Sequence, residues 1–208
     1  MESRIQAVLE RLEARSQQEN SLLESLRSQG GSAIRERAEN LMLDVGPEVG
    51  LFLNLLVRST RATAVIEIGG SVGYSTIWLA EAVRANGGRL YSFEVNSAKQ
   101  QEQKENLEAA GLLSVVELLD REAIEVIPEI ETDIDLVLLD HWKELYVRDF
   151  EVCWPKLKTG GCIVADNILR PQKNAAVISA YLDRVRACTD ARSTLLPIGD
   201  GIEMTVKI

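Results

Sequence analysis

From Ala64 onward, the chain alternates short runs of β-branched and aliphatic residues with longer stretches of helical character. This alternation is typical of βα units, in which each helix crosses back over the sheet to the start of the next parallel strand. Because such crossovers are right-handed, the sequence predicts a doubly wound, Rossmann-like α/β fold. The expected strands are 64–69, 89–95, 114–119, 134–140 and 161–166, and the expected helices are 73–86, 97–110, 121–128, 144–157 and 171–187.

The C-terminal part of the chain breaks this alternation. Gly199-Asp-Gly201 separates two runs rich in aliphatic and β-branched residues, residues 193–198 and 202–208. Two glycines around an aspartate favour a tight turn, so these runs are expected to pair as an antiparallel hairpin. The predicted fold is therefore a mostly parallel, seven-stranded sheet with a C-terminal antiparallel hairpin at its edge.

The N-terminal part of the chain is expected to add extra helices. Apolar residues recur there at helical spacing, and Gly30-Gly31 and Gly46-Pro47 interrupt the pattern. One or two helices are predicted over residues 2–28, one over 33–43, and one that starts at Gly46-Pro47. These helices are expected to cover part of the site, to pack on the core or to form the face of a homodimer.

Length and composition favour a single domain. A chain of 208 residues, 46% of them hydrophobic, can bury one full core. It shows no internal repeat and no low-complexity linker. We interpret residues 1–208 as one domain, with a helical cap over 1–60 and an α/β core over 61–208.

The charge and cysteine content argue against several partners and locations. The net charge of -9 repels nucleic acid backbones and anionic lipid surfaces. The three cysteines lack CxxC spacing, which favours reduced thiols over a disulfide framework. No signal peptide and no apolar run of membrane-spanning length is visible. These features predict a cytoplasmic protein without nucleic acid or membrane partners.

The first βα turn carries the pattern Glu-x-Gly-x-x-x-Gly, with Glu67 two residues before Gly69. Ser71 stands where a dinucleotide-binding G-x-G-x-x-G motif has its second glycine, which disfavours a nicotinamide-dependent oxidoreductase. Glu67 would repel a pyrophosphate but suits a cationic cofactor. Glu94 ends the second expected strand, where a carboxylate can accept both hydroxyls of an adenosine ribose. A ribose and a positive head group together indicate S-adenosylmethionine, although a glycine turn alone also fits tight packing.

Polar residues also follow two later strands. Asp140 ends the run 134–139, and Asp166-Asn167 ends the run 162–165. If the two strands are parallel neighbours, three oxygen ligands meet at one edge with Lys143 close by, a set that suits a Mg²⁺-type cation. Taken separately, these residues also fit a helix cap and a turn. Their shared position at the carboxyl ends of strands favours a site.

Together these motifs resemble the metal-dependent, class I S-adenosylmethionine O-methyltransferases, the family that includes the catechol and caffeoyl-CoA enzymes, from about residue 40 to the C-terminus. The tetrad Asp140-His141-Trp142-Lys143 is similar to that of the animal catechol enzyme, and the Asp166-Asn167 pair is shared across the family. The resemblance implies that Asp140, Asp166 and Asn167 bind Mg²⁺ or another divalent cation. It also implies that Lys143 is the general base.

The same resemblance implies a set of residues that bind S-adenosylmethionine. Val45 matches the family's segment beside the methionine end of the cofactor, and Trp142 matches the aromatic residue beside its adenine. The implied cofactor-binding residues are Val45, Glu67, Gly69, Ser71, Ser75, Glu94, Glu122, Ala123, Asp140 and Trp142.

The chain departs from the family pattern at three places that bear on its ligands. Arg121-Glu122-Ala123 replaces a Gly-Asp/Ser-Ala segment that contacts adenine. Thr194 aligns with a glutamate that faces the second substrate hydroxyl in the catechol enzyme. Residues 168–173 lack a Gly-rich insertion, so the substrate rim is expected to be short and open.

The expected reaction is Mg²⁺-dependent transfer of the methyl group of S-adenosylmethionine to one hydroxyl of a catechol-like, vicinal dihydroxy aromatic. A free phenol has a pKa near 10, so only about one molecule in a thousand is a nucleophilic phenolate at neutral pH, and a metal and a base must compensate. Alternatives are a larger natural-product or CoA-linked hydroxyl acceptor, and a non-catalytic S-adenosylmethionine-binding protein. His141 is an alternative base, but it is expected to diverge from the metal and pack behind the site.

Overall fold

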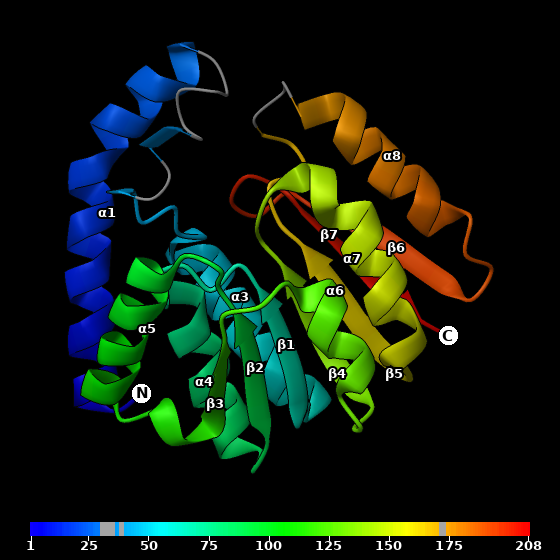
Figure 1. Ribbon diagram of the computed structural model, residues 1–208, viewed down its shortest axis with the longest axis horizontal. Helices are drawn as coiled ribbons and strands as arrows, with labels where there is room; N and C mark the ends of the chain where they lie inside the picture. The colour runs from blue at the N-terminus through cyan, green and yellow to red at the C-terminus, as the bar shows by residue number, and fades with distance from the viewer. Residues whose placement is uncertain (30–35, 38–39, 171–173) are drawn as a thin grey trace.

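The computed structural model describes residues 1–29, 36–37, 40–170 and 174–208. Its centre is a seven-stranded sheet with the order β3-β2-β1-β4-β5-β7-β6 (Figure 1). The strands are β1 Ala64–Ile68, β2 Arg89–Phe93, β3 Val116–Leu119, β4 Ile134–Leu139, β5 Leu157–Ala165, β6 Ala191–Leu196 and β7 Ile202–Lys207. The main helices are α1 Ser3–Gln29, α3 Gly46–Thr60, α4 Tyr74–Ala85, α5 Ser97–Ala110, α6 Ala123–Val126, α7 Tyr146–Cys153 and α8 Ala175–Arg186.

The sheet confirms the predicted fold class. Strands β1 to β5 pair in parallel, whereas β7 runs antiparallel to both β5 and β6. The C-terminal hairpin is therefore present, and its second strand β7 is the one that joins the sheet next to β5. This insertion leaves β6 at the edge.

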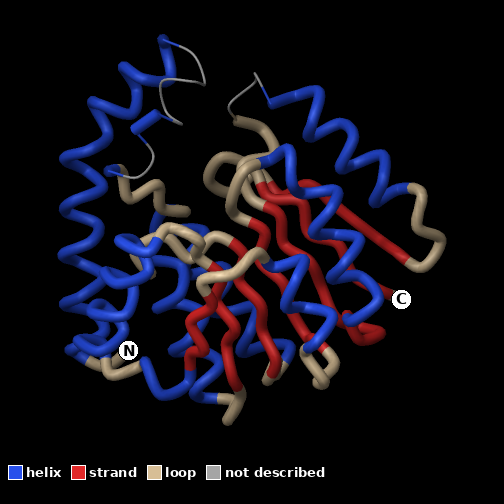
Figure 2. The backbone as a smooth tube through the Cα atoms, in the orientation of Figure 1, coloured by secondary structure: helices blue, strands red, loops and turns tan. Residues whose placement is uncertain are grey.

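Helices cover both faces of the sheet, as a doubly wound fold requires (Figure 2). Side chains alternate between the faces along each strand. Val65 and Leu136 pack in one cluster with residues of α1, α3 and α4. Ile66 and Val137 pack in a second cluster with residues of α6, α7 and α8.

Two helices are shorter than predicted because prolines end them. Pro155 lies in a 3₁₀ turn, Trp154–Lys156, directly after α7, so the helix expected over 144–157 stops at Cys153 and β5 begins at Leu157. Pro128 similarly places a 3₁₀ turn after α6. Proline lacks the N–H that a continuing helix needs, and its ring clashes with the preceding turn.

The N-terminal residues form one long helix rather than two. On α1, Ile5 and Leu12 are fully buried, and the helix packs against α5 and α4 (Figure 1). Of the helix predicted over 33–43, residues 33–35 and 38–39 lie outside the described residues and residues 36–37 are helical. Its last part is wrong because residues 41–45 are not helical. Residues 171–173 of the last predicted helix also lie outside the described part, and α8 begins at Ala175.

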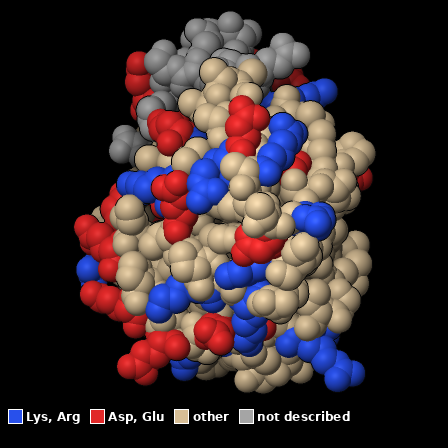
Figure 3. All heavy atoms as spheres, turned by 90° about the vertical axis from the view of Figure 1, so that its right-hand side faces the viewer, with Lys and Arg blue, Asp and Glu red and all other residues tan. Residues whose placement is uncertain are grey.

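The surface has mixed charge on the side that faces the viewer in Figure 3, where acidic and basic side chains are interspersed. Among the described helices, none combines the length and the apolar character that crossing a bilayer requires.

Candidate functional site

A cleft of about 1130 Å³ opens at the carboxyl ends of the parallel strands. Its walls come from the ends of β1, β2 and β4, the segment before α3, and one face of α1. Small-molecule pockets usually measure about 300–1000 Å³, so this cleft has room for more than one small ligand. The predicted site residues that line it are Val45, Gly69, Ser71, Glu94, Glu122, Ala123, Asp140, Trp142, Lys143 and Asn167.

Backbone hydrogen bonds bring the ends of neighbouring strands together at this edge. The amide of Asp140 donates to the Ile68 carbonyl at 3.0 Å, and that of Asp166 donates to the Leu139 carbonyl at 3.0 Å. Residues that directly follow β1, β4 and β5 therefore lie side by side. This is the switch point of the fold, because the chain leaves β1 for α4 on one face and β4 for α7 on the other.

The first βα turn approaches the end of β4 so closely that it needs glycine. Gly69 has φ +104°, and a Cβ there would collide with the backbone carbonyl of Asp140. The turn is also fixed by Glu94, whose Oε2 accepts a hydrogen bond from the Ser71 amide at 2.9 Å. The other oxygen of Glu94 accepts from the Asn96 amide at 2.8 Å. Glu94 thus lies at the predicted ribose position and also holds the glycine turn.

Glu67 and Ser75 lie behind the cleft wall instead of lining the cleft. Glu67 is fully buried and accepts hydrogen bonds from the hydroxyls of Ser75, Thr76 and Ser92 at 2.6, 2.6 and 2.5 Å. Burial raises the pKa of Glu67 to about 7, although the three hydroxyl donors oppose the shift. Direct contact of either residue with a cofactor stays a prediction, and the structure gives Glu67 the role of bracing β1 against α4 and β2.

The two aspartates of the predicted metal site directly follow the neighbouring strands β4 and β5, and Asp140 lines the cleft whereas Asp166 lies behind it. Asp166 is 2% exposed and accepts a hydrogen bond from the Asn167 amide at 2.7 Å. Burial and the negative charge of Asp140 raise the pKa of Asp166 well above its ordinary value. Two such carboxylates repel each other, and a divalent cation held by their oxygens would offset that repulsion. The donor chemistry therefore fits a hard cation.

The rest of the coordination would come from other oxygen donors. The described residues contain no group of three or more His, Cys, Asp or Glu side chains suited to a metal ion. A cation bound by Asp140 and Asp166 would thus rely on the Asn167 amide and on water or ligand oxygens. Asp200, which sequence reasoning did not assign to the site, also lines the cleft and adds negative charge near Asp166.

Lys143 lines the cleft and is held in place by a tyrosine that sequence reasoning missed. Its side chain is 8% exposed, and Nζ donates to the Tyr146 hydroxyl at 2.8 Å and lies 3.3 Å from Oδ1 of Asp140. The Tyr146 hydroxyl lies 2.7 Å from the Leu139 carbonyl and 3.1 Å from the Asp166 carbonyl. Tyr146 therefore links Lys143 to the ends of β4 and β5. Its position three residues after Lys143, at the start of α7, is the sequence signal for this contact.

His141 is engaged by another partner. Its Nε2 lies 2.7 Å from Oδ2 of Asp149 on α7, and its ring stacks on Tyr146 with centroids 5.5 Å apart. The imidazole thus packs against α7, while His141 also lines the cleft, and its role as a supporting residue instead of the base stays a prediction.

The predicted adenine end of the cleft lies at the start of α6. Ala123 is 3% exposed there, while the carboxylate of Glu122 accepts a hydrogen bond from Arg148 at 2.9 Å. Trp142 is 39% exposed at the rim. Among the described residues, Thr194 does not line the cleft. Its expected place beside the acceptor stays a prediction.

Known proteins resemble the chain in both sequence and structure. The model of a family described as O-methyltransferase matches residues 13–208. A catechol O-methyltransferase from Mycobacterium tuberculosis is 32% identical over 176 residues, which cover 83% of this chain and 77% of that protein. The crystal structure of an O-methyltransferase from Bacillus cereus in complex with SAH is 27% identical, with a TM-score of 0.76, and the match covers 90% of this chain and 91% of that chain.

Other relatives are matched over less of their length. A catechol O-methyltransferase from Niastella koreensis is 33% identical over 135 residues, which cover 63% of this chain and 61% of that protein. The mouse catechol O-methyltransferase is 29% identical over 174 residues, 79% of this chain and 65% of that protein. The chain therefore spans less than two thirds of these two relatives.

Proposed function

This chain belongs to the O-methyltransferase family, and from that premise we propose that it moves the methyl group of S-adenosylmethionine to one hydroxyl of a catechol-like, vicinal dihydroxy aromatic, with Mg²⁺ or a similar cation bound. The observation that carries the proposal is the position of Lys143. Its Nζ lies beside Asp140, in a cleft that is lined by eight of the ten predicted cofactor residues, all except Glu67 and Ser75.

The proposed cofactor is supported by the cleft and by a relative. The cleft is large enough for a nucleoside cofactor together with an acceptor. Glu94 lies at the end of β2, where a carboxylate can bind ribose hydroxyls. The related Bacillus cereus protein was crystallised with SAH, the demethylated form of the same cofactor.

The proposed chemistry divides between the metal ligands and Lys143. Asp140, Asp166 and Asn167 would hold the cation, which supplies charge stabilisation for a developing phenolate. Lys143 takes the phenolic proton on Nζ, and Asp140 and Tyr146 keep that nitrogen in place. The walls of the cleft hold acceptor and donor at contact distance, which removes much of the entropic cost of their encounter.

Other parts of the proposal concern partners and location. We infer a small-molecule acceptor from the catechol O-methyltransferase relatives. The net charge of -9 argues against nucleic acid and membrane partners, and the three free cysteines favour a cytoplasmic protein. A homodimer remains a prediction.

The direct test is an assay of the purified protein with S-adenosylmethionine and a panel of catechols, with added Mg²⁺ or with EDTA. We expect a singly methylated product that needs the cation. Full turnover in EDTA would refute the metal. Binding of SAH without turnover of any small catechol would redirect the proposal to a larger or CoA-linked acceptor, or to a non-catalytic binding protein.

Changing Tyr146 to phenylalanine should lower kcat by about ten- to a hundredfold, because loss of the hydroxyl frees Lys143 to move from its position. The KM for S-adenosylmethionine should be unchanged. Steady-state kinetics with catechol measure both values.

The matched control is Tyr181→Phe. Tyr181 is equally buried and lies edge-on to Tyr146 with centroids 5.5 Å apart, but its hydroxyl lies near Thr205 instead of Lys143. Its variant should keep the wild-type kcat. Equal losses in the two variants would mean that packing, and not the link to Lys143, explains the effect.

A further inference from the structure

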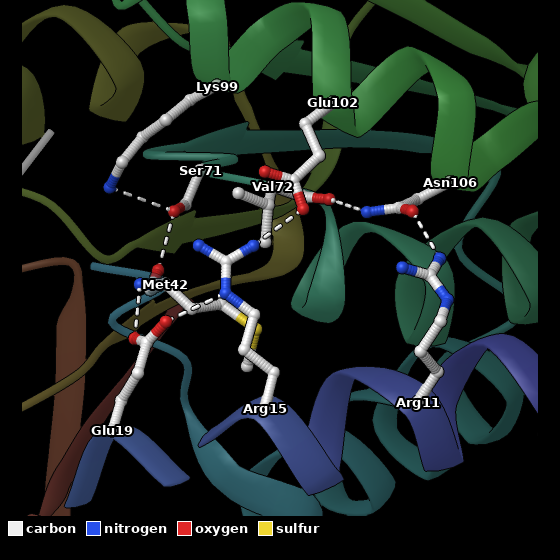
Figure 4. A network of polar contacts seen from close by, with 9 residues as sticks. All are labelled: Arg11, Arg15, Glu19, Met42, Ser71, Val72, Lys99, Glu102 and Asn106. Carbon is white, nitrogen blue, oxygen red and sulfur yellow. Dashed lines mark hydrogen bonds and ion pairs between the residues drawn. The ribbon is translucent and has the colours of Figure 1, made fainter. Parts of the chain in front are cut away.

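Lys99 projects from the start of α5 into the cleft (Figure 4). Asn96 caps this helix, since its side chain accepts hydrogen bonds from the amides of Ala98 and Lys99 at 3.0 and 3.1 Å. The ammonium group of Lys99 donates to the Ser71 hydroxyl at 3.2 Å. That hydroxyl in turn donates to the Met42 carbonyl at 2.6 Å. Lys99 thus faces the segment that leads to Val45.

The acidic side chains nearest to Lys99 already have other partners. Figure 4 shows Arg15 between Glu19 and Glu102, to which it forms ion pairs of 2.7 and 2.6 Å. Both carboxylate oxygens of Glu94 accept backbone amides. In the part of the chain that the structure describes, no carboxylate lies within 4.0 Å of the Lys99 ammonium group.

The other lysine and arginine side chains that line the cleft each lie beside a carboxylate. Lys143 lies 3.3 Å from Asp140, and Arg148 lies 2.9 Å from Glu122. Arg121 pairs with Glu125 and Glu129 on the surface. Lys99 differs because no described carboxylate lies within ion-pair distance of it, and because burial lowers its pKa more than the charges of Glu94, Glu19 and Glu102 raise it. An anionic ligand group beside it would offset that cost.

We propose that Lys99 binds the carboxylate of the amino-acid moiety of S-adenosylmethionine, an assignment that rests on the proposed function. The carboxylate is the one anionic group of this cofactor. Lys99 contacts Ser71, whose amide donates to Glu94, the predicted ribose ligand. The Ser71 hydroxyl donates to the carbonyl of Met42, which precedes the segment with Val45 that is predicted to face the methionine end. The N-terminus of α5 adds positive potential at the same place.

The test compares two ligands that share the nucleoside and a neutral sulfur but differ in the amino acid. Calorimetry measures the binding of S-adenosylhomocysteine and of methylthioadenosine to the wild type and to Lys99→Met. We expect the variant to bind S-adenosylhomocysteine about ten- to a hundredfold more weakly, as for loss of a charged hydrogen bond, and methylthioadenosine with unchanged affinity. Lys99→Arg, which keeps the charge, should recover part of the loss.

Lys104→Met on the exposed side of α5 is the control, and it should bind both ligands as the wild type does.

Equal weakening of both ligands in Lys99→Met would overturn the proposal and place Lys99 on the ribose side. An unchanged affinity for S-adenosylhomocysteine would also overturn it. If, in that case, the KM for protocatechuate, a catechol with a ring carboxylate, rose while that for catechol did not, Lys99 would instead bind a carboxylate of the acceptor. Failure of the wild type to bind S-adenosylhomocysteine would refute the proposed function itself.

Discussion

Replacing Lys143 with alanine is expected to lower kcat by about a hundred- to ten-thousandfold, the range for loss of a positioned general base. The side chain is almost fully buried, and its nitrogen is fixed by Asp140 and Tyr146, so the variant loses a base that is held in one position. Binding of S-adenosylhomocysteine should stay intact. Single-turnover methylation of catechol and calorimetry measure the two effects.

Chemical rescue distinguishes a base from a structural residue at this position. The alanine variant leaves space in the lining of the cleft, and a small primary amine such as ethylamine should restore part of the lost rate. Lys104→Ala, on the exposed side of α5, is the control and should be unaffected by the amine. A variant that keeps the wild-type rate, or that loses cofactor binding in parallel, would remove Lys143 from the role of base.

The parts of the site that the sequence predicts are those fixed by strand order. Gly69, Asp140 and Asp166 each directly follow a strand, and parallel neighbours bring such positions to one edge whatever the surrounding helices do. The sheet itself was predictable for the same reason, because each βα unit marks its strand through local composition.

The parts that the sequence did not predict depend on contacts between distant elements. Arg15 of α1 reaches Glu102 of α5 across 87 positions of the chain, and no local pattern marks that pair. Lys99 likewise bonds to Ser71, which lies 28 positions earlier in the chain. The sequence shows the strand that carries Glu67 but not the hydroxyls of Thr76 and Ser92 that surround its carboxylate, so the bracing role of Glu67 was not predicted. Its contact with the cofactor stays a prediction.

Changing Asp166 to asparagine should reduce methyl transfer by about a thousandfold or more, because several kcal/mol of charge stabilisation by the metal would be lost. Asparagine preserves the size of the side chain and the hydrogen bond that its oxygen accepts from the Asn167 amide. It removes one of the two negative charges that would attract the cation. Turnover of catechol at saturating Mg²⁺ measures the loss.

Thermal melting gives a second measurement that does not need the reaction. A ligand that binds only the folded state raises its stability by mass action, so Mg²⁺ should raise the Tm of the wild type. It should not raise the Tm of Asp166→Asn, whereas Asp183→Asn on the exposed surface of α8 should respond like the wild type. Without the cation, Asp166→Asn should melt no lower than the wild type, because it relieves the repulsion between Asp140 and Asp166. If Mg²⁺ raised the Tm of Asp166→Asn as much as that of Asp183→Asn, the cation would bind elsewhere. Asp140 and Asp166 would then not be its ligands.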